Sequence, residues 1–336
     1  MRTAKPKQVD VARVAGVSQA TVSQVLSAKS DFNVPLETRQ RIFDAVIQLG
    51  YVPNELARSL RTQRTYTIAS VIPDIANPFY PTFERGVQDI AEAHNYDLIV
   101  YNTDGIESKE RRCLDALLRG RVDGVIGVFF HLTRADLERL PERDIALVLL
   151  DQPRGTDSTP VDHVFVDNAK AASAATTYLL ELGHERVAML TGQHETLSGR
   201  VDGYRQALAA RDAGFEPIIH EAGDFTEACG YSGMLELLRR TPRPSAVFAA
   251  NDVMAMGALV AMREHGVKVP EEIALIGFDD IPAARILTPS LTTVSQFPQH
   301  LGRRAAELLM DQLESNTPIP PRHVELPFEL IVRESA

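Results

Sequence analysis

From Thr67 onward, short apolar runs rich in β-branched residues alternate with longer stretches of helical periodicity. Such alternation is typical of βαβ units, in which helices join parallel strands and cover the sheet. The runs form two series along the chain. The first comprises residues 68–72, 98–101, 124–128 and 146–150, and the second comprises residues 164–166, 187–190, 246–249 and 273–276. The pattern therefore predicts an α/β body of two lobes, each built on a doubly wound parallel sheet.

Helical stretches separate the strands of the second series, and a tail follows it. The helices are predicted at residues 169–182, 201–211, 228–238 and 253–265. In the tail we expect one helix at residues 301–313 and one strand at residues 323–332, which complete the two lobes.

A different pattern, at residues 10–26, predicts two short helices around a glycine turn. The apolar face of the first helix is formed by Val11, Ala12 and Ala15. Gly16 can adopt the positive φ that the turn needs, and Ser18 can cap the second helix through its hydroxyl group. This arrangement is typical of a helix-turn-helix, a small all-α unit whose second helix enters the DNA major groove.

The second helix presents a short polar face. Val22, Val25 and Leu26 are expected to face the core. The candidates for contact with DNA are Ser18, Gln19, Ala20, Thr21, Ser23 and Gln24. Their hydrogen-bonding groups suit base edges in the major groove. The alternative for the same pattern is an ordinary pair of helices inside a larger core.

A third amphipathic helix is predicted at residues 36–49, with Gly50 as its end. Its apolar positions are Ile42, Phe43, Val46, Ile47 and Leu49. After it, Asn54 can cap a helix of barely two turns, which is marginal alone in water. We expect that short helix to form only against a partner or DNA, so it is a candidate coupling element.

The charges are unevenly distributed. The 336 residues carry a formal net charge of −10, but residues 1–66 hold ten Lys and Arg and only five Asp and Glu. A basic head on an acidic body favours nucleic acid at one end only. The 44% of hydrophobic and 24% of charged residues are typical of a soluble globular protein.

Taken together, these segments resemble the lactose-repressor (LacI/GalR) family of transcriptional regulators along nearly the whole chain. The residues that carry the resemblance are the 10–26 block, Tyr51-Val52-Pro53-Asn54 with Ala57-Arg58-Ser59-Leu60, Pro73-Asp74-Ile75-Ala76-Asn77-Pro78-Phe79-Tyr80, Arg121-Val122-Asp123-Gly124, Gly183-His184, Gly199-Arg200 with Gly203-Tyr204, Asn251-Asp252, Gly277-Phe278-Asp279-Asp280, Leu291-Thr292-Thr293-Val294 and Glu329-Leu330-Ile331-Val332-Arg333. One departure matters: Gln24 stands where the family usually has arginine.

The resemblance implies a division of the chain. It places a helix-turn-helix domain at 1–52, a hinge helix and linker at 53–66, and an effector-binding and dimerisation domain, similar to periplasmic binding proteins, at 67–336. The lobes would comprise about 67–162 with 293–321, and about 163–292 with 322–336, so that the chain crosses near Asp162, Thr292 and Arg322. In the hinge, the implied DNA contacts are Asn54, Ala57, Leu60 and Arg61, with Leu60 as an apolar wedge in the minor groove.

Ligands of such sheets bind beyond the carboxyl ends of the strands, which with two lobes is the cleft between them. The candidates for effector binding are Phe79, Tyr80, Asp151, Arg200, Phe225, Asn251, Asp279 and Gln296. Aromatic rings can pack on the faces of a polyhydroxylated ring, and Arg, Asn and Asp can bind its hydroxyl groups. By resemblance, Arg200 corresponds to an effector-binding residue.

Each candidate also has a structural alternative. The aromatic residues could be core residues, Asp279 and Asp280 could form a turn, and Asn251 could cap a helix. Arg200 is harder to explain structurally, because a cation at a helix start opposes the helix dipole.

Signatures of enzymes and cofactor sites are missing from the sequence. There is no phosphate-binding glycine loop, no zinc spacing and no nucleophile elbow, and Cys113 and Cys229 are expected to be free thiols on helices. Asp279 and Asp280 are neighbours, so their side chains should diverge. We expect no catalytic residue, no metal and no cofactor.

The sequence therefore predicts a cytoplasmic repressor that binds a palindromic operator as a homodimer and responds to a small metabolite, a sugar or sugar derivative. One short recognition helix contacts few base pairs, so specificity needs two half-sites. A sugar-binding transport module is the alternative; the N-terminal helices and the lack of an apolar secretion signal or membrane span argue against it. An enzyme with a DNA-binding head would need a catalytic constellation that is not found.

Overall fold

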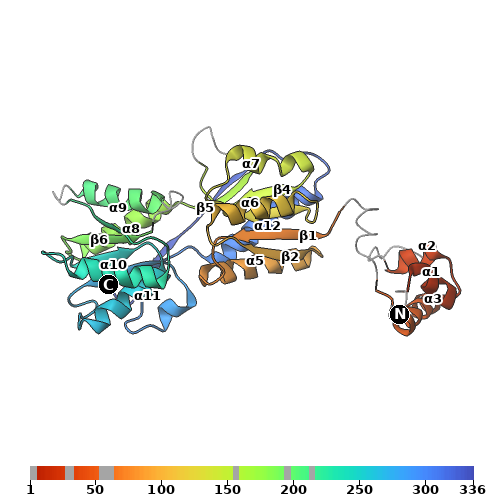
Figure 1. Ribbon diagram of the computed structural model, residues 1–336, viewed down its shortest axis with the longest axis horizontal. Helices are drawn as coiled ribbons and strands as arrows, with labels where there is room; N and C mark the ends of the chain where they lie inside the picture. The colour runs from red at the N-terminus through yellow and green to blue at the C-terminus, as the bar shows by residue number, and fades with distance from the viewer. Residues whose placement is uncertain (1–5, 27–33, 53–63, 154–158, 193–197, 212–215) are drawn as a thin grey trace. The chain divides into compact units, whose positions relative to one another are not determined.

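The computed structural model describes residues 6–26, 34–52, 64–153, 159–192, 198–211 and 216–336 (Figure 1). The chain divides into two compact units, Met1–Thr65 and Tyr66–Ala336, which we call the head and the body. The predicted division at residues 52 and 53 falls beside residues outside this description, so it stays a prediction.

The head contains three helices in its described residues: α1 (Gln8–Ala15), α2 (Gln19–Leu26) and α3 (Leu36–Leu49). Gly16 and Gly50 end α1 and α3 with φ of 64° and 60°, the left-handed conformation that glycine adopts at no steric cost. The Ser18 hydroxyl accepts a hydrogen bond from the Thr21 backbone N–H, at 3.0 Å. The predicted helix-turn-helix is confirmed, including its turn and its cap.

The head core is small, and one part of the predicted apolar face lies outside it. The buried residues are Val11, Ala12, Ala15, Val22, Ile42 and Ala45. On α3, Val46 and Leu49 pack against this core, whereas Phe43 and Ile47 remain 45% and 78% exposed. Three short helices enclose only one stripe of α3, and Phe43 and Ile47 lie one step around the helix from that stripe.

The first lobe of the body is built on a parallel sheet. Within the described residues it has six strands in the order β11-β5-β4-β3-β1-β2. The strands are β1 (Thr67–Ile72), β2 (Asp97–Asn102), β3 (Gly124–Gly127), β4 (Ala146–Leu149), β5 (Asp162–Val166) and β11 (His323–Leu326). All five neighbouring pairs are parallel.

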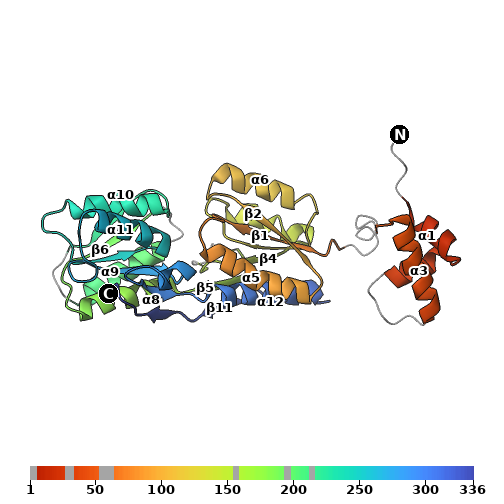
Figure 2. The ribbon, with the colours of Figure 1, turned by 90° about the horizontal axis from the view of Figure 1, so that it is seen from below.

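Helices cover both faces of this sheet, as Figure 2 shows. One face is covered by α5 (Phe79–Ala93) and α12 (Pro298–Glu314), and the other by α6 (Glu107–Leu117), α7 (Arg134–Glu138) and the short 3₁₀ helix η1 (Pro141–Arg143). Strand alternation supplies both cores: Ile68 packs with α5, whereas Ala69 and Val71 pack with α6.

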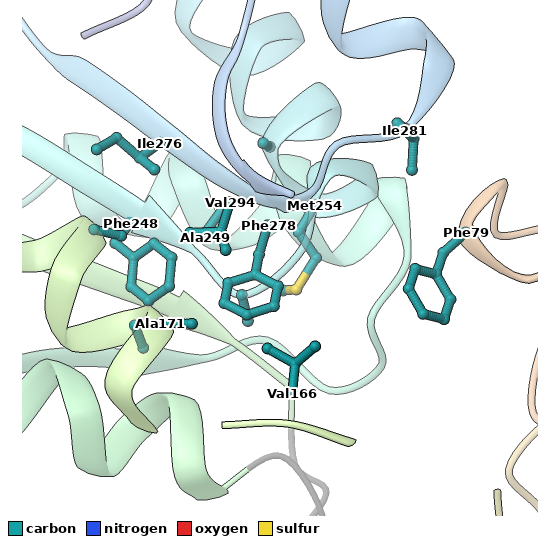
Figure 3. Packing of buried hydrophobic residues seen from close by; sticks show 14 of the residues in the cluster. Phe79, Val166, Ala171, Phe248, Ala249, Met254, Ile276, Phe278, Ile281 and Val294 are labelled. Atoms are coloured by element: carbon teal, nitrogen blue, oxygen red, sulfur yellow. The ribbon is translucent and has the colours of Figure 1, made fainter. Parts of the chain in front are cut away.

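The second lobe has a sheet with the order β12-β10-β9-β8-β6-β7. Its strands are β6 (Val187–Thr191), β7 (Ile218–Glu221), β8 (Ala246–Ala249), β9 (Ala274–Asp279), β10 (Thr292–Ser295) and β12 (Glu329–Ile331). Its helices are α8 (Asn168–Glu181), α9 (Ser198–Ala210), α10 (Glu227–Leu238), α11 (Asp252–Glu264) and the 3₁₀ helix η4 (Pro282–Arg285). Phe248 and Phe278 pack side by side in its core, and Phe79 approaches from the first lobe (Figure 3).

One expectation about the tail is wrong. The predicted single strand at 323–332 is two strands, because Pro327 has no N–H and ends the first of them. β11 pairs with β5 in the first sheet, whereas β12 pairs antiparallel with β10 in the second. The sequence also missed β7, a half-buried edge strand, and β10, which is buried although three of its four residues carry hydroxyl groups.

The predicted crossings between the lobes each lie a few residues too early. Since β5 and β11 belong to the first sheet and β10 to the second, the chain crosses after Val166, after Ser295 and after Leu326 rather than near Asp162, Thr292 and Arg322. Each crossing therefore follows a complete strand. The carboxyl ends of those strands lie where the two lobes meet.

Candidate functional site

A cavity of about 850 Å³ lies at the carboxyl ends of the strands and is lined by residues of both lobes. All eight residues predicted to bind an effector line it: Phe79, Tyr80, Asp151, Arg200, Phe225, Asn251, Asp279 and Gln296. Topology brings them together from seven separate segments, as the rule for parallel sheets requires. Their contact with a ligand stays a prediction.

Arg200 lies in the first turn of α9 and is only 6% exposed. Its Nε donates a hydrogen bond to Asn168 Oδ1 at 2.9 Å, and Nη1 donates to the Ala250 carbonyl. The guanidinium carbon lies 3.8 Å from the centre of the Phe278 ring. These partners give the buried cation a structural role that the sequence did not reveal, while its position on the cavity wall is as predicted.

Asp279 ends β9 with φ of 116°, an uncommon conformation for a residue other than glycine. Its Oδ1 accepts a hydrogen bond from Gln296 Nε2 at 2.7 Å and lies 3.7 Å from Arg200 Nη2. Burial raises the pKa of Asp279 to about 6, against the opposing effects of Arg200 and Gln296. Asp280 turns away and binds Arg333 at 2.6 Å, so the two carboxylates diverge as predicted.

Asn251 has the structural role that the sequence left open. It is the N-cap of α11: Oδ1 accepts from the Met254 N–H at 2.8 Å, and Nδ2 donates to the Phe225 carbonyl at 3.2 Å. Asn251 therefore both caps the helix and lines the cavity, so the two roles do not exclude each other. The same side chain fixes the backbone beside Phe225, which also lines the cavity.

The first lobe contributes aromatic rings and a carboxylate. Phe79 and Tyr80 open α5 with their rings edge to face and their centres 5.1 Å apart. Asp151 follows β4, and its Oδ1 lies 2.7 Å from Nδ1 of the buried His163. Burial lowers the pKa of His163, but its bonds to Asp151 and to the Thr159 carbonyl outweigh that effect and raise it overall.

Sequence reasoning missed several residues of the cavity wall, including His163, Asn168, Phe129 and Phe130. Asn168 and the two phenylalanines each follow a predicted strand by one or two residues. The strand-end rule would therefore have found them if it had been applied to every strand. His163 lies inside β5, and no signal in the sequence distinguishes it from a core residue.

In the head, the candidates for DNA binding form one face of α2 and the turn before it. Ser18, Gln19, Ala20 and Gln24 are exposed, whereas Val22 on the opposite side is fully buried. Thr21 and Ser23 are half-buried. This face is available for bases, but base contacts stay a prediction. Asn54, Ala57, Leu60 and Arg61 lie outside the described residues.

The described residues contain no cluster of three or more His, Cys, Asp or Glu side chains that could hold a metal ion. Cys113 and Cys229 are both free thiols, and burial raises the pKa of Cys113 to about 12. Among the helices described, none is both long and apolar enough to cross a membrane.

Comparison with protein families gives two matches. Residues 9–54 match the model of the bacterial regulatory proteins of the lacI family, and residues 176–336 match a periplasmic binding protein-like domain. The chain is 36% identical to the HTH-type transcriptional regulator CelR of Thermobifida fusca, over 99% of each chain. It is 34% identical to the ribose operon repressor of Escherichia coli K12, over 97% of this chain and 98% of the repressor.

Solved structures agree. A complex of the transcriptional regulator CelR with cellobiose matches with a TM-score of 0.73 and 33% identity, over 98% of this chain and 100% of CelR. The lac repressor dimer bound to operator and the anti-inducer ONPF matches with a TM-score of 0.85 and 26% identity, over 99% of each chain. These matches span the head and both lobes of the body, so the whole arrangement has counterparts in solved transcriptional regulators.

Proposed function

The chain belongs to the lacI family of bacterial regulatory proteins, whose members are DNA-binding regulators of transcription and not enzymes, and we propose that its cavity binds a neutral polyhydroxylated metabolite that controls operator binding. The observation that carries this proposal is a cavity lined by both lobes, with Arg200, Asp279 and Gln296 on one wall and Phe79 and Tyr80 on the other. The alternative of a transport module does not account for the head.

On the DNA side, the regulator acts as a homodimer on a palindromic operator. α2 has eight residues, and a recognition helix of that length contacts few base pairs, so two half-sites are needed. The base contacts come from the exposed face of Ser18, Gln19, Ala20 and Gln24, together with Thr21 and Ser23. Asn54, Ala57, Leu60 and Arg61 belong to a hinge at 53–66 that binds the minor groove. The lac repressor supports this arrangement, since it was solved as a dimer on its operator.

On the effector side, the charge of the cavity favours a neutral ligand. Among the described lining residues, five are aspartates (Asp74, Asp104, Asp151, Asp224 and Asp279) and two are arginines (Arg134 and Arg200). Arg134 pairs with Glu138, and Arg200 is held by Asn168, Ala250 and Asp279. An anionic ligand would meet an excess of negative charge. A neutral sugar can instead accept and donate hydrogen bonds along the polar wall and pack its ring faces on Phe79 and Tyr80.

A ligand that contacts both lobes favours one arrangement of the lobes over others, because it binds that arrangement more tightly. The same free energy couples the ligand to the operator, so each changes the affinity of the other by the same factor. A regulator of bacterial transcription acts on the chromosome, and we place this protein in the cytoplasm for that reason.

A thermal-shift screen of the full chain tests the proposal. A saturating ligand at about a hundred times its Kd stabilises the body by about 2.7 kcal/mol. The screen covers neutral sugars, sugar phosphates, nucleosides and purines, and each stabilising compound is then added to a titration of operator DNA. Stabilisation by a neutral sugar that also changes operator affinity is expected. Stabilisation only by anionic compounds, or by none, contradicts the proposal.

A further inference from the structure

The cavity extends across both helical layers of the first lobe. Phe79 and Leu301 line it from the layer of α5 and α12, and Leu132 and Leu137 line it from the layer of α6 and α7. The strand ends lie between these layers. The cavity therefore reaches across the strand ends from one face of the sheet to the other, and its volume of about 850 Å³ is near the upper end of the range of roughly 300–1,000 Å³ for small-molecule sites.

The part next to α6 and α7 has a wall of its own, formed by the loop that follows β3. Phe129, Phe130 and Leu132 of this loop all line the cavity. The Phe129 ring lies directly against Gly127: a Cβ at that glycine would be 2.5 Å from the ring. A larger residue at position 127 would push the ring away from the strand, so the glycine fixes how closely the aromatic wall approaches the sheet.

Glu110 binds the backbone of this loop on the side away from the cavity. Its side chain is fully buried on α6 and does not line the cavity. Oε1 accepts a hydrogen bond from the Phe130 N–H at 2.8 Å, and Oε2 accepts from the N–H groups of His131 and Leu132 at 2.9 and 3.2 Å. Three successive backbone donors thus converge on one carboxylate. Hydrogen bonds to an ionised acceptor are about twice as strong as neutral ones.

A second contact fixes the same loop at its exposed side. His131 Nε2 donates to the Gly105 carbonyl, at 2.9 Å, and Gly105 itself lines the cavity in the loop after β2. The loops after β2 and β3 are therefore joined around this end of the cavity. An aromatic wall held at two points is preformed rather than assembled by the ligand, which reduces the entropy lost on binding.

We propose that the end of the cavity walled by Phe129, Phe130 and Leu132 is a second sugar subsite, that Glu110 is the positioning residue that holds it, and that the effector is a neutral saccharide of at least two rings. This inference rests on the proposed function and specifies its ligand. The first ring binds near Arg200, Asp279 and Gln296, and the second packs its apolar face on Phe129. Since the two subsites belong to different walls, their contributions can be separated by ligand size.

Calorimetric titration of the full chain tests the inference. The probes are cellobiose, maltose and lactose, with glucose, galactose and ribose as single-ring sugars. At least one disaccharide should bind at least about tenfold more tightly than its own monosaccharides. Phe129→Ala should weaken that disaccharide by about tenfold and the monosaccharides by less than about twofold, because only the second ring contacts Phe129.

Glu110→Gln should give the same pattern, since an amide offers one acceptor oxygen where the carboxylate offers two. The double variant with Phe129→Ala should bind the disaccharide no more weakly than Phe129→Ala alone, because Glu110 acts through the wall. Glu107→Gln on the exposed side of the same helix, where it pairs with Arg111, is the matched control and should change nothing. If Glu110→Gln does not fold, the Phe129→Ala titrations decide the question.

The outcomes separate the two proposals. Binding of monosaccharides as tightly as disaccharides, with no size-dependent loss in Phe129→Ala, overturns the second subsite and leaves the proposed function standing. An equal loss for one-ring and two-ring sugars in Glu110→Gln overturns the positioning role. If none of the saccharides binds, this inference fails; the proposed function fails with it only if the thermal-shift screen also finds no neutral compound that stabilises the protein.

Discussion

The head and the body expose their functional side chains to very different degrees. In the head, Gln19 and Gln24 lie on the surface of α2, away from a core of six small and medium-sized side chains. In the body, Arg200, Asp279 and Gln296 are 6%, 4% and 6% exposed, and they bind one another. Gln19 and Gln24 thus stand clear of the head core, whereas Arg200, Asp279 and Gln296 are part of the fold of the body.

This difference has a consequence for mutation. An exposed side chain can be exchanged with little effect on the free energy of unfolding, so DNA specificity can change while the head stays folded. A buried charge that loses its partner destabilises the fold. Changes of effector specificity should therefore be coupled to stability, and changes of operator specificity should not.

The largest effect is expected for Arg200→Ala. The change leaves the Asp279 carboxylate buried without its cation, which lowers the free energy of unfolding by about 3–5 kcal/mol. The variant should also lose the response of operator binding to the effector, while operator affinity without effector stays within a few-fold of the wild type. Chemical unfolding followed by circular dichroism and operator titration by fluorescence anisotropy measure the two quantities.

Arg205→Ala is the matched control, because Arg205 lies on the same helix and is exposed. Its unfolding free energy should stay within about 0.5 kcal/mol of the wild type. A wild-type effector response in Arg200→Ala would show that the cavity wall has been assigned to the wrong residues.

The next largest effect is expected for Gln24→Arg in the head. Glutamine pairs with adenine and arginine with guanine, so base preference should change at one position of each half-site, by about 1–3 kcal/mol. Stability should stay within about 0.5 kcal/mol because Gln24 is exposed. Sites selected from random DNA measure the preference. Gln48→Arg is the control: it adds the same charge on α3 and should leave the relative affinities for different DNA sequences unchanged. If wild type and Gln24→Arg select identical sites, Gln24 does not contact a base.

Most of the fold follows from local patterns. Gly16 and Gly50 mark helix ends because only glycine adopts positive φ easily, and the apolar runs from Ile68 to Ile276 mark most of the strands. The ends of predicted strands indicated most of the eight candidate residues of the cavity wall, because parallel sheets collect their carboxyl ends at one edge. Phe225 and Gln296 are the exceptions, since they follow β7 and β10, two strands that the sequence missed.

What the sequence did not reveal depends on contacts between distant segments. Glu110 resembles any acidic residue on an exposed helix until the loop after β3 places three N–H groups around it. Thr293 in β10 looks unsuited to a core strand, but its hydroxyl binds Asp252 at 2.6 Å. The sheet to which β5 and β11 belong is set by pairing across about 160 residues, which no local pattern contains.

An effect that depends on pH is expected for Glu84→Gln on α5, which tests whether every buried polar atom of the body needs a hydrogen-bond partner. Glu84 Oε1 accepts from the Ser70 hydroxyl at 2.5 Å, whereas Oε2 is the one buried side-chain polar atom among the described residues without a hydrogen-bond partner. Burial raises the pKa of Glu84 from 4.5 to about 7. The folded state then binds more protons than the unfolded state between these values.

Stability should therefore fall as pH rises from about 4.5 through about 7, and Glu84→Gln, which stays neutral, should remove that part of the pH dependence. At pH 8 the variant should be more stable than the wild type by up to about 3 kcal/mol, because the rise of the pKa from 4.5 to about 7 then acts almost in full, at about 1.36 kcal/mol for each pKa unit. Unfolding free energies measured between pH 5 and pH 8 check this. Glu92→Gln, exposed on the same helix, is the control; parallel pH curves for wild type and Glu84→Gln would show that Glu84 is ionised throughout.

The smallest effect is expected at Ser18, which serves both as the cap of α2 and as a candidate DNA contact. Ser18→Ala removes the acceptor of the Thr21 N–H and should cost about 1 kcal/mol, whereas Ser18→Gly, which leaves that N–H open to water, should cost only a few tenths. Hydrogen exchange of the amides in residues 19–26 measures both. Because Ser18→Gly barely changes the helix, its operator affinity isolates the hydroxyl group. A loss of operator affinity much larger than the loss of helix stability shows that the hydroxyl group contacts DNA. An equal loss shows that Ser18 acts only as a cap. In that case the head uses a structural side chain at its binding surface, as the body does with Asn251, the cap of α11.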